Sequence, residues 1–241
     1  MRGRTMTRFL ICLLLAATPL PAAAQVPSRD VLAGAARAFD ESALRLGDDN
    51  ARPTSIRKWR EPIKLAFDNA STHPDLVPIT RQAINLIAVE AGVTVIDLPT
   101  REGGNFVVYF DENGVNGKAG YCFANSWWKS WAINRAELRI NPTRMRDIDR
   151  CTVHEAMHAF GFNSHPHAAD SILSYTYHGR RALSPLDLHL IRTLYDPRLT
   201  PGMRPAPASQ LACRLLGERL GSSAGDIEAV CRDRKGPTPA L

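Results

Sequence analysis

The sequence predicts an α+β fold: a mixed, twisted sheet of about five strands, two long helices, a C-terminal helix and a small helical appendage. Three observations favour this class. Short β-rich runs separated by turn residues fill the stretch 56–141, interrupted by one segment with apolar residues at helical spacing. A second helical pattern carries His154 and His158. A third begins at Ser184 with the residues typical of a helix start.

The first 24 residues have the features of a secretory signal peptide. A basic start is followed by an apolar run too short to span a bilayer, and Ala22-Ala23-Ala24 supplies a small-residue cleavage signal. No later stretch of the sequence is long and apolar enough for a membrane helix. We therefore expect a secreted or periplasmic protein without an integral membrane segment.

The net charge argues against nucleic acid as a partner. Removal of residues 1–24 takes away three arginines and no acids, which lowers the net charge from +6 to +3. This charge is mild, and the sequence has no basic run interleaved with aromatic residues. The rest of the chain is long enough for one core with a small appendage, and we expect a monomer.

The elements of the N-terminal half can be placed in order. Residues 25–55 are rich in Ala, Arg and Asp, and we expect one helix over 31–46; whether this segment is an inhibitory propeptide stays open. From Ile56 the pattern becomes that of a folded domain over 56–203. Its first elements are a strand over 56–67 that is broken at Pro62, a helix over 76–91 that ends at Gly92, and strands over 93–98, 105–110, 120–128 and 136–141.

A helix over about 143–160 carries the motif HEAMHAFG, residues 154–161. Residues four apart share a helix face, so His154 and His158 can direct their imidazoles at one ion. Glu155 is rotated by about 100° from His154 and can reach a water on that ion. Gly161 suits the end of this helix, because glycine tolerates a positive φ. The motif predicts a zinc site with three protein ligands and a position left for water.

The C-terminal part begins with a well-defined helix start. Ser184 is an N-cap, Pro185 takes the first helical position and Asp187 the third, and the helix ends before Pro197. Over 204–241 we expect a Pro-rich linker, a hairpin of two short helices and a tail. The linker composition covers 201–209, and the two helices are expected over 210–220 and 226–231.

The cysteines predict two disulfides. Four remain after the signal peptide, an even number in an exported protein, and the sequence has no CxxC pair. We predict Cys122–Cys151, which ties an expected edge strand to the start of the histidine helix. We also predict Cys213–Cys231, which clips the two short helices together. The other pairings would cross-link the tail to the domain across the linker.

The sequence downstream of the motif resembles metzincin peptidases. Ser171-Ile172-Leu173-Ser174-Tyr175 is similar to the turn that lies beneath the zinc in that family, with Leu173 in place of methionine. The segment SPLDLHLIRTLYDP, 184–197, resembles the C-terminal helix of the matrixin and serralysin branches. The stretch 56–203 further resembles a bacterial family of uncharacterised exported domains thought to be zinc proteases. The resemblance implies a metzincin-like fold and a Zn²⁺ cofactor.

The third metal ligand departs from the metzincin pattern. That pattern expects it three residues after Gly161, where this sequence has Ser164. His165, His167 and Asp170 are the candidates. The resemblance favours His165, because the bacterial family often has an acidic residue at that position. We therefore predict a loop one residue longer than the usual one.

The resemblance also implies catalytic roles. Glu155 would act as the general base of peptide-bond hydrolysis, and Tyr175 would donate a hydrogen bond to the oxyanion. The segment 117–125 would form the edge strand that holds an extended peptide or protein substrate, and Trp127, Trp128 and Trp131 would line the neighbouring surface.

Two functions follow from these expectations. The first is a secreted or periplasmic zinc endopeptidase, which the intact Glu155 favours, since a structural metal site needs no general base. The second is a non-catalytic envelope-binding domain on the same fold with a vestigial or structural metal, which the displaced third ligand favours.

Overall fold

Six α-helices and one short 3₁₀ helix occur in the part of the chain that the computed structural model describes, residues 28–47, 52–112, 122–143, 148–174 and 179–237. The predicted signal peptide and Tyr175 lie outside these residues. The helices are α1 (Arg29–Ala43), α2 (Leu76–Ala91), α3 (Ile148–Ala159), α4 (Pro185–Leu194), α5 (Pro205–Leu220) and α6 (Ala224–Cys231), with the 3₁₀ helix η1 over Ala70–Thr72.

Most strands belong to one mixed sheet, which together with the helices makes the fold α+β. Its strands are β3 (Lys58–Trp59), β4 (Ile63–Asp68), β5 (Val95–Asp97), β6 (Phe106–Phe110), β7 (Cys122–Lys129) and β8 (Ala132–Ile140). The order is β3-β8-β6-β4-β5, all parallel pairs, and β7 pairs antiparallel with β8. The sheet has six strands rather than about five because the expected strand over 56–67 is interrupted before Ile63. Its two halves, β3 and β4, pair with different neighbours.

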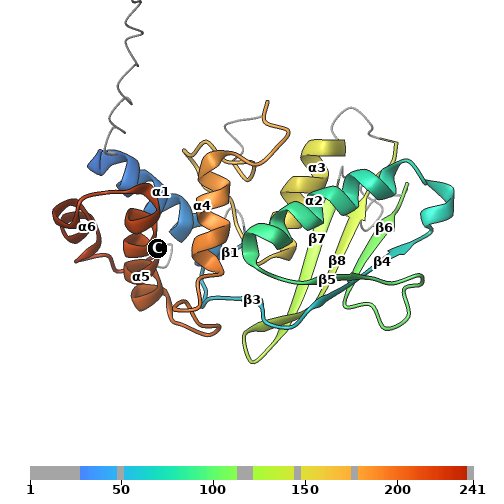
Figure 1. The fold of residues 1–241 in the computed structure, drawn as a ribbon, viewed down its shortest axis with the longest axis horizontal. Helices are drawn as coiled ribbons and strands as arrows, with labels where there is room; N and C mark the ends of the chain where they lie inside the picture. The colour runs from blue at the N-terminus through green and yellow to red at the C-terminus, as the bar shows by residue number, and fades with distance from the viewer. Residues whose placement is uncertain (1–27, 48–51, 113–121, 144–147, 175–178, 238–241) are drawn as a thin grey trace, which may run out of the picture.

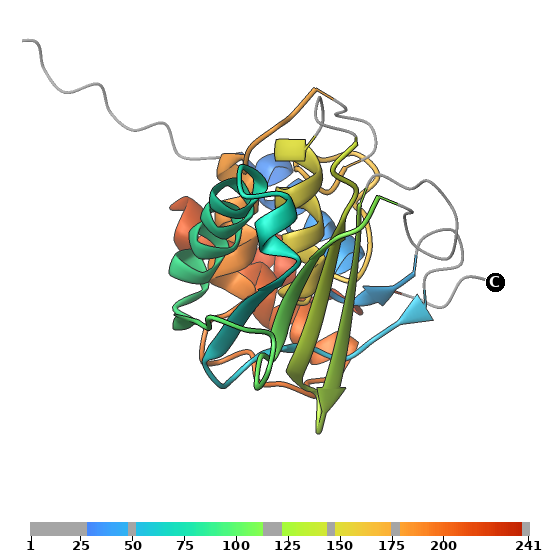
Figure 2. The same ribbon diagram turned by 90° about the vertical axis from the view of Figure 1, so that its right-hand side faces the viewer.

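Two helices cover one face of this sheet. Figures 1 and 2 show α2 and α3 side by side on it. Helix α2 turns Ile84 and Ile87 into the core, and it ends, as predicted, at Gly92 with a φ of 66°. On the sheet, Phe106 and Val108 of β6 are fully buried. Truncating one large apolar side chain at such a position typically costs about 2–5 kcal/mol of stability.

The strand β7 lies at an edge of the sheet. Within the described part of the chain it pairs with β8 alone, from Cys122 opposite Ile140 to Lys129 opposite Ala132. A register irregularity falls between Trp127 and Trp128. A long edge strand leaves a row of backbone N–H and C=O groups on one side open to another extended chain.

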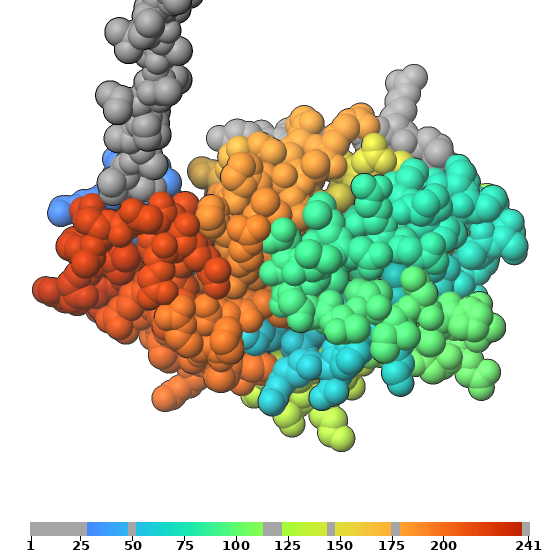
Figure 3. Space-filling view, viewed as in Figure 1, coloured from blue at the N-terminus to red at the C-terminus, as the bar shows by residue number. Residues whose placement is uncertain are grey.

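The remaining helices form a second group beside the sheet. Helix α1 packs against α5 and α6, and α4 lies between the C-terminal helices and α2, as Figures 1 and 3 show. Leu32 and Phe39 of α1 and Leu215 of α5 belong to the same buried cluster as the sheet. The N-terminal and C-terminal segments therefore share the core of the domain.

The structure corrects the prediction for both of these segments. The expected linker over 201–209 is wrong from Pro205 onward, because α5 begins there with proline at the first helical position, which needs no backbone N–H donor. The expected helix over 31–46 is α1, which ends at Ala43; Arg45–Leu46 then form β1, antiparallel to β2 (Arg52–Pro53). Of the helix expected over about 143–160, the described residues show α3 over Ile148–Ala159, and Thr143 lies in a turn.

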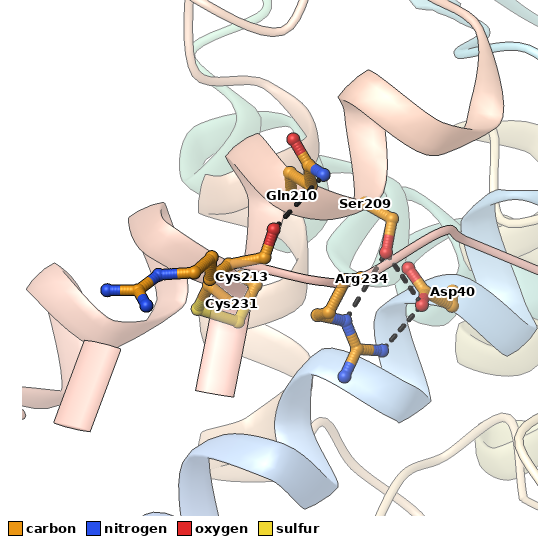
Figure 4. The surroundings of a disulfide bond; sticks show 7 residues. Asp40, Ser209, Gln210, Cys213, Cys231 and Arg234 are labelled. Atoms are coloured by element: carbon orange, nitrogen blue, oxygen red, sulfur yellow. Dashed lines mark hydrogen bonds and ion pairs between the residues drawn. A yellow bond between two sulfur atoms is a disulfide. The ribbon is translucent and has the colours of Figure 1, made fainter. Parts of the chain in front are cut away.

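Figure 4 shows how the C-terminal helices are tied to each other and to α1. A disulfide joins Cys213 of α5 to Cys231 of α6. The carboxylate of Asp40 in α1 accepts hydrogen bonds from the Ser209 hydroxyl at 2.8 Å and from the Arg234 guanidinium at 2.5 Å. Burial raises the pKa of Asp40, and the Arg234 charge opposes this shift.

The other predicted disulfide, Cys122–Cys151, is also present and ties β7 to α3 with a Cα–Cα distance of 5.9 Å. Both pairings were predicted from the sequence. None of the described helices combines the length and apolar character needed to cross a membrane.

Candidate metal centre

Helix α3 directs two histidines to the same side. Its core face carries Val153, Ala156 and Met157, all buried, whereas His154 and His158 lie on the partly exposed face one turn apart. This alternation follows from the 3.6-residue period, which places positions four apart above one another. The rings of the two histidines are 4.8 Å apart between centroids.

The end of α3 is held from outside the helix. The Trp59 indole donates to the carbonyl of Ala159 at 3.0 Å, and the Tyr195 hydroxyl donates to that of Phe160 at 2.9 Å. These bonds satisfy carbonyls that a helix end otherwise leaves without a partner. Gly161 follows with a φ of 107°, as predicted, and a Cβ atom there would lie 2.3 Å from the Arg57 carbonyl oxygen. Glycine is thus required both by the conformation and by the close backbone contact.

His165 joins the two helix histidines. Its Nε2 lies 3.0 Å from Nε2 of His154 and 3.1 Å from Nε2 of His158, and the latter two atoms are 3.2 Å apart. Among the described residues this is the one cluster of three histidine, cysteine or acidic side chains close enough to hold one metal ion. The other two candidates for the third ligand lie outside the cluster: His167 is exposed, and the carboxylate of Asp170 pairs with Arg180.

The Nδ1 atoms of His154 and His158 point away from the cluster, so their Nε2 atoms face its centre. Nδ1 of His154 lies 2.9 Å from the Ile172 carbonyl oxygen, and Nδ1 of His158 lies 2.5 Å from that of Phe162. A carbonyl can only accept, so each Nδ1 carries the proton and each Nε2 presents a lone pair. Burial, with the charge of His158 next, lowers the pKa of His154 well below its usual value, which keeps the ring neutral.

The donor set fits zinc. Tetrahedral coordination with Zn–N bonds of about 2.0–2.1 Å places the nitrogens about 3.3 Å from one another. The observed separations of 3.0–3.2 Å are close to this value. Lone pairs on His154 and His158 that face each other at this distance are stabilised by a cation between them, and neutral imidazole is a preferred zinc ligand.

A buried turn contacts His154 through the carbonyl of Ile172. Ser171–Ser174 form this turn, closed by the Ser174 N–H donating to the Ser171 carbonyl, and Leu173 in its centre is fully buried. Asp187, the predicted third residue of α4, binds the turn directly: it accepts from the Ser171 hydroxyl at 2.5 Å and from the Ile172 N–H at 3.0 Å. The sequence identified Asp187 only as a helix cap, a role that it also fills through the Ser184 N–H.

The histidines lie in a cleft of about 1000 Å³. The edge strand β7 forms one side, with Asn125, Trp127 and Trp128 among the lining residues. Glu155 lies in the same cleft as the histidines, and Leu46 and Gly47 also line it. The cleft thus brings the proposed general base, the histidine cluster and an edge strand together.

Two tryptophans give the cleft an exposed aromatic surface. Trp127 and Trp128 are each 40% exposed, and Trp131 beside them is 42% exposed. The Arg57 guanidinium stacks on Trp128, 3.5 Å from the ring centroid. Burial lowers the pKa of Arg57 to about 10. Of the three tryptophans expected next to the site, Trp127 and Trp128 line the cleft, whereas Trp131 is not among its lining residues.

Sequence comparison relates the chain to one family. Residues 33–212 match the family described as "Protein of unknown function (DUF2927)", a stretch that includes the histidine cluster, the edge strand and most of α1. No curated protein shows significant similarity to the sequence.

Proposed function

This chain belongs to the DUF2927 family, and we propose that it is a zinc-dependent endopeptidase that acts outside the cytoplasm, in the periplasm or after secretion. The observation that carries the proposal is the convergence of three histidine Nε2 atoms in a cleft that Glu155 also lines. A structural metal site is closed by its ligands, whereas this cluster offers three ligands at an open cleft.

His154, His158 and His165 would hold the ion through Nε2. Zinc in such a site supplies a Lewis acid that makes water nucleophilic near neutral pH. The carbonyls of Ile172 and Phe162 keep the rings of His154 and His158 in the orientation and tautomer that ligation needs.

Glu155 is the proposed general base. It follows His154 directly on α3, so its side chain leaves the helix about 100° around the axis and enters the cleft beside the histidines. Its carboxylate takes the proton from the attacking water and passes it to the leaving amine. General acid–base catalysis of this kind contributes about 10²–10⁴ in rate. Tyr175 remains our proposal for the hydrogen-bond donor to the oxyanion.

The substrate would be an extended peptide or protein segment that pairs with β7. This strand has its outer edge on the cleft, and backbone pairing at a sheet edge recognises peptides with little dependence on their sequence. We propose that one chain suffices for this activity.

A second candidate function is a non-catalytic domain that binds envelope components and keeps a structural metal. The exposed Trp127 and Trp128 favour it, because exposed aromatic side chains at a cleft are typical of binding surfaces. The two functions differ in whether any bond is hydrolysed.

The discriminating experiment uses the protein from residue 25 onward. Zinc content is measured after dialysis, and cleavage of casein, gelatin and a peptide library is followed by mass spectrometry of the products. One zinc per chain with peptide products supports the endopeptidase. One zinc per chain with no hydrolysis of any substrate would favour the binding domain.

A further inference from the structure

The loop that carries His165 is bound to the segment that follows α1. Four hydrogen bonds join residues 163–167 to residues 41–47. In sequence order of the loop, they are Gly47 N–H to Asn163 O at 3.3 Å, Ser164 N–H to Ser42 O at 3.1 Å, Ser164 Oγ–H to Gly47 O at 2.7 Å, and His167 N–H to Glu41 Oε2 at 3.0 Å. They bracket His165 on both sides.

Ser164 is central to this contact. It stands where the metzincin pattern expects a ligand, and it is 3% exposed. Both its backbone N–H and its hydroxyl donate to carbonyls of the N-terminal segment. A buried hydroxyl with such a partner positions the chain next to it, here the neighbouring His165.

The N-terminal segment is itself firmly held. Phe39 and Leu44 are fully buried in the shared core. On its other side, Asp40 binds Ser209 and Arg234, which connects the segment to the disulfide-linked C-terminal helices (Figure 4). Residues 41–47 therefore form a fixed support for the loop.

The same segment also lines the cleft. Leu46 and Gly47 are among the residues around it, together with Asn163 and His165 of the loop. Removal of this segment would take away part of the lining of the cleft as well as the support of the loop.

We propose that residues 41–47 are a permanent part of the metal centre, with Ser164 as the positioning residue that holds His165 in place. The N-terminal segment is then no removable propeptide, because its loss would release the third ligand. The proposal rests on the proposed function in one respect only, that His165 binds the ion. A loop that already has its bound conformation loses less conformational entropy when the metal ion binds.

The test compares Ser164→Ala with Ser223→Ala in the full mature chain. Ser223 is the N-cap of α6 and its loss costs a hydroxyl hydrogen bond at a helix that does not line the cleft. Zinc affinity is measured by competition with a chromophoric chelator. We expect Ser164→Ala to weaken zinc binding roughly tenfold, the range found when a group that orients a ligand is removed, and Ser223→Ala to leave it unchanged. The absorption spectrum of bound cobalt should change only in Ser164→Ala.

A second readout does not depend on metal. Hydrogen exchange in the metal-free protein reports the amides of Ser164 and His167, which donate to Ser42 and Glu41. We expect faster exchange of the peptide over 161–168 in Ser164→Ala and in Glu41→Ala, and wild-type exchange in Ser223→Ala. Wild-type zinc affinity and wild-type exchange in Ser164→Ala would overturn the proposal. If the wild-type protein bound no zinc, the proposed function would fail, and exchange alone would decide whether this segment positions the loop.

Discussion

The carbonyl oxygen of Ile172 lies 2.9 Å from Nδ1 of His154, and the N–H of the same residue donates to the carboxylate of Asp187. The backbone of Ile172 therefore links the start of α4, where Asp187 lies, to His154 of the cluster. Asp187 is fully buried, and burial raises the pKa of its carboxyl group. The carboxylate accepts hydrogen bonds from the Ser171 hydroxyl and from the N–H groups of Ile172 and Ser184, which suits its ionised form.

Replacement of this carboxylate should loosen the turn and, through it, His154. In Asp187→Asn the amide nitrogen cannot accept one of the hydrogen bonds, so we expect a loss of about 1–3 kcal/mol in the free energy of unfolding. We expect zinc affinity to fall at least tenfold, because the group that orients a ligand is displaced. Urea unfolding and chelator competition measure the two effects. Asp226→Asn, at the corresponding position of α6, is the control, because it removes a charge that contacts Ser223 and Arg29 away from the cleft. Equal zinc affinity in both variants would show that the turn does not orient His154.

The third ligand can be identified by two single substitutions. His165→Ala removes a nitrogen that lies 3.0 and 3.1 Å from the other two, whereas His167→Ala removes an exposed ring outside the cluster. We expect His165→Ala to lose zinc far more severely, measured as metal content after dialysis against a weak chelator. The reverse order would transfer the role to His167. Retention of zinc in both variants would leave Asp170 to be tested.

The disulfide Cys122–Cys151 should stabilise the cleft as well as the fold, because both cysteines line it. The two residues are 29 apart, and the chain-entropy account assigns roughly 3.5 kcal/mol to a loop of this size. We expect the double Cys→Ser variant to unfold at correspondingly lower urea concentration. Peptide mapping without reduction is the companion measurement. It should recover Cys122 joined to Cys151, and recovery of Cys122 joined to Cys213 would contradict the structure.

The stability of the domain should depend on pH through Lys58. Lys58 is buried, and its Nζ donates to the carbonyls of Leu194 and Asp196. Burial lowers the pKa of Lys58 to about 8. Between this value and the ordinary value of 10.5 the unfolded chain binds more protons than the folded one, so the contribution of Lys58 to stability rises with pH.

Below pH 8 both states carry the charge, and the cost of its burial is present in full. We expect this contribution to rise by up to roughly 3 kcal/mol across the window. The measurement is the free energy of unfolding at several pH values, as the difference between the wild-type protein and Lys58→Met. A difference that stays constant from pH 7.5 to pH 10.5 would contradict the shifted pKa.

The elements that the sequence predicted correctly are those set by residues close together in the chain. Helix α2 with Gly92, the start of α4 at Ser184 and the positive φ of Gly161 all follow from spacing and from the conformations that single residues allow. The placement of His154 and His158 on one helix face is also local. The disulfide pairings could be predicted because each joins two elements that were already expected.

The features that the sequence could not reveal depend on contacts between distant residues. Ser164 binds Gly47, 117 positions away, and Asp40 binds Arg234, 194 positions away. Neither pair leaves a periodic pattern. The strand order likewise follows from packing, and Pro205 was interpreted as part of a linker although it begins α5. The only signal in the sequence for the support of His165 was a serine at the position where the metzincin pattern expects a ligand.

The proposed activity is hydrolysis of peptide bonds by Glu155 together with a zinc ion held by His154, His158 and His165. Its most direct test is the rate of cleavage of one peptide by zinc-loaded wild-type protein and by zinc-loaded Glu155→Gln, with metal content measured on the same samples. Glu102→Gln, an exposed residue in the turn between β5 and β6, is the matched control. We predict one zinc per chain in all three proteins, wild-type cleavage in Glu102→Gln, and cleavage slower by about 10²–10⁴ in Glu155→Gln. Full activity of Glu155→Gln with its zinc in place would contradict the account.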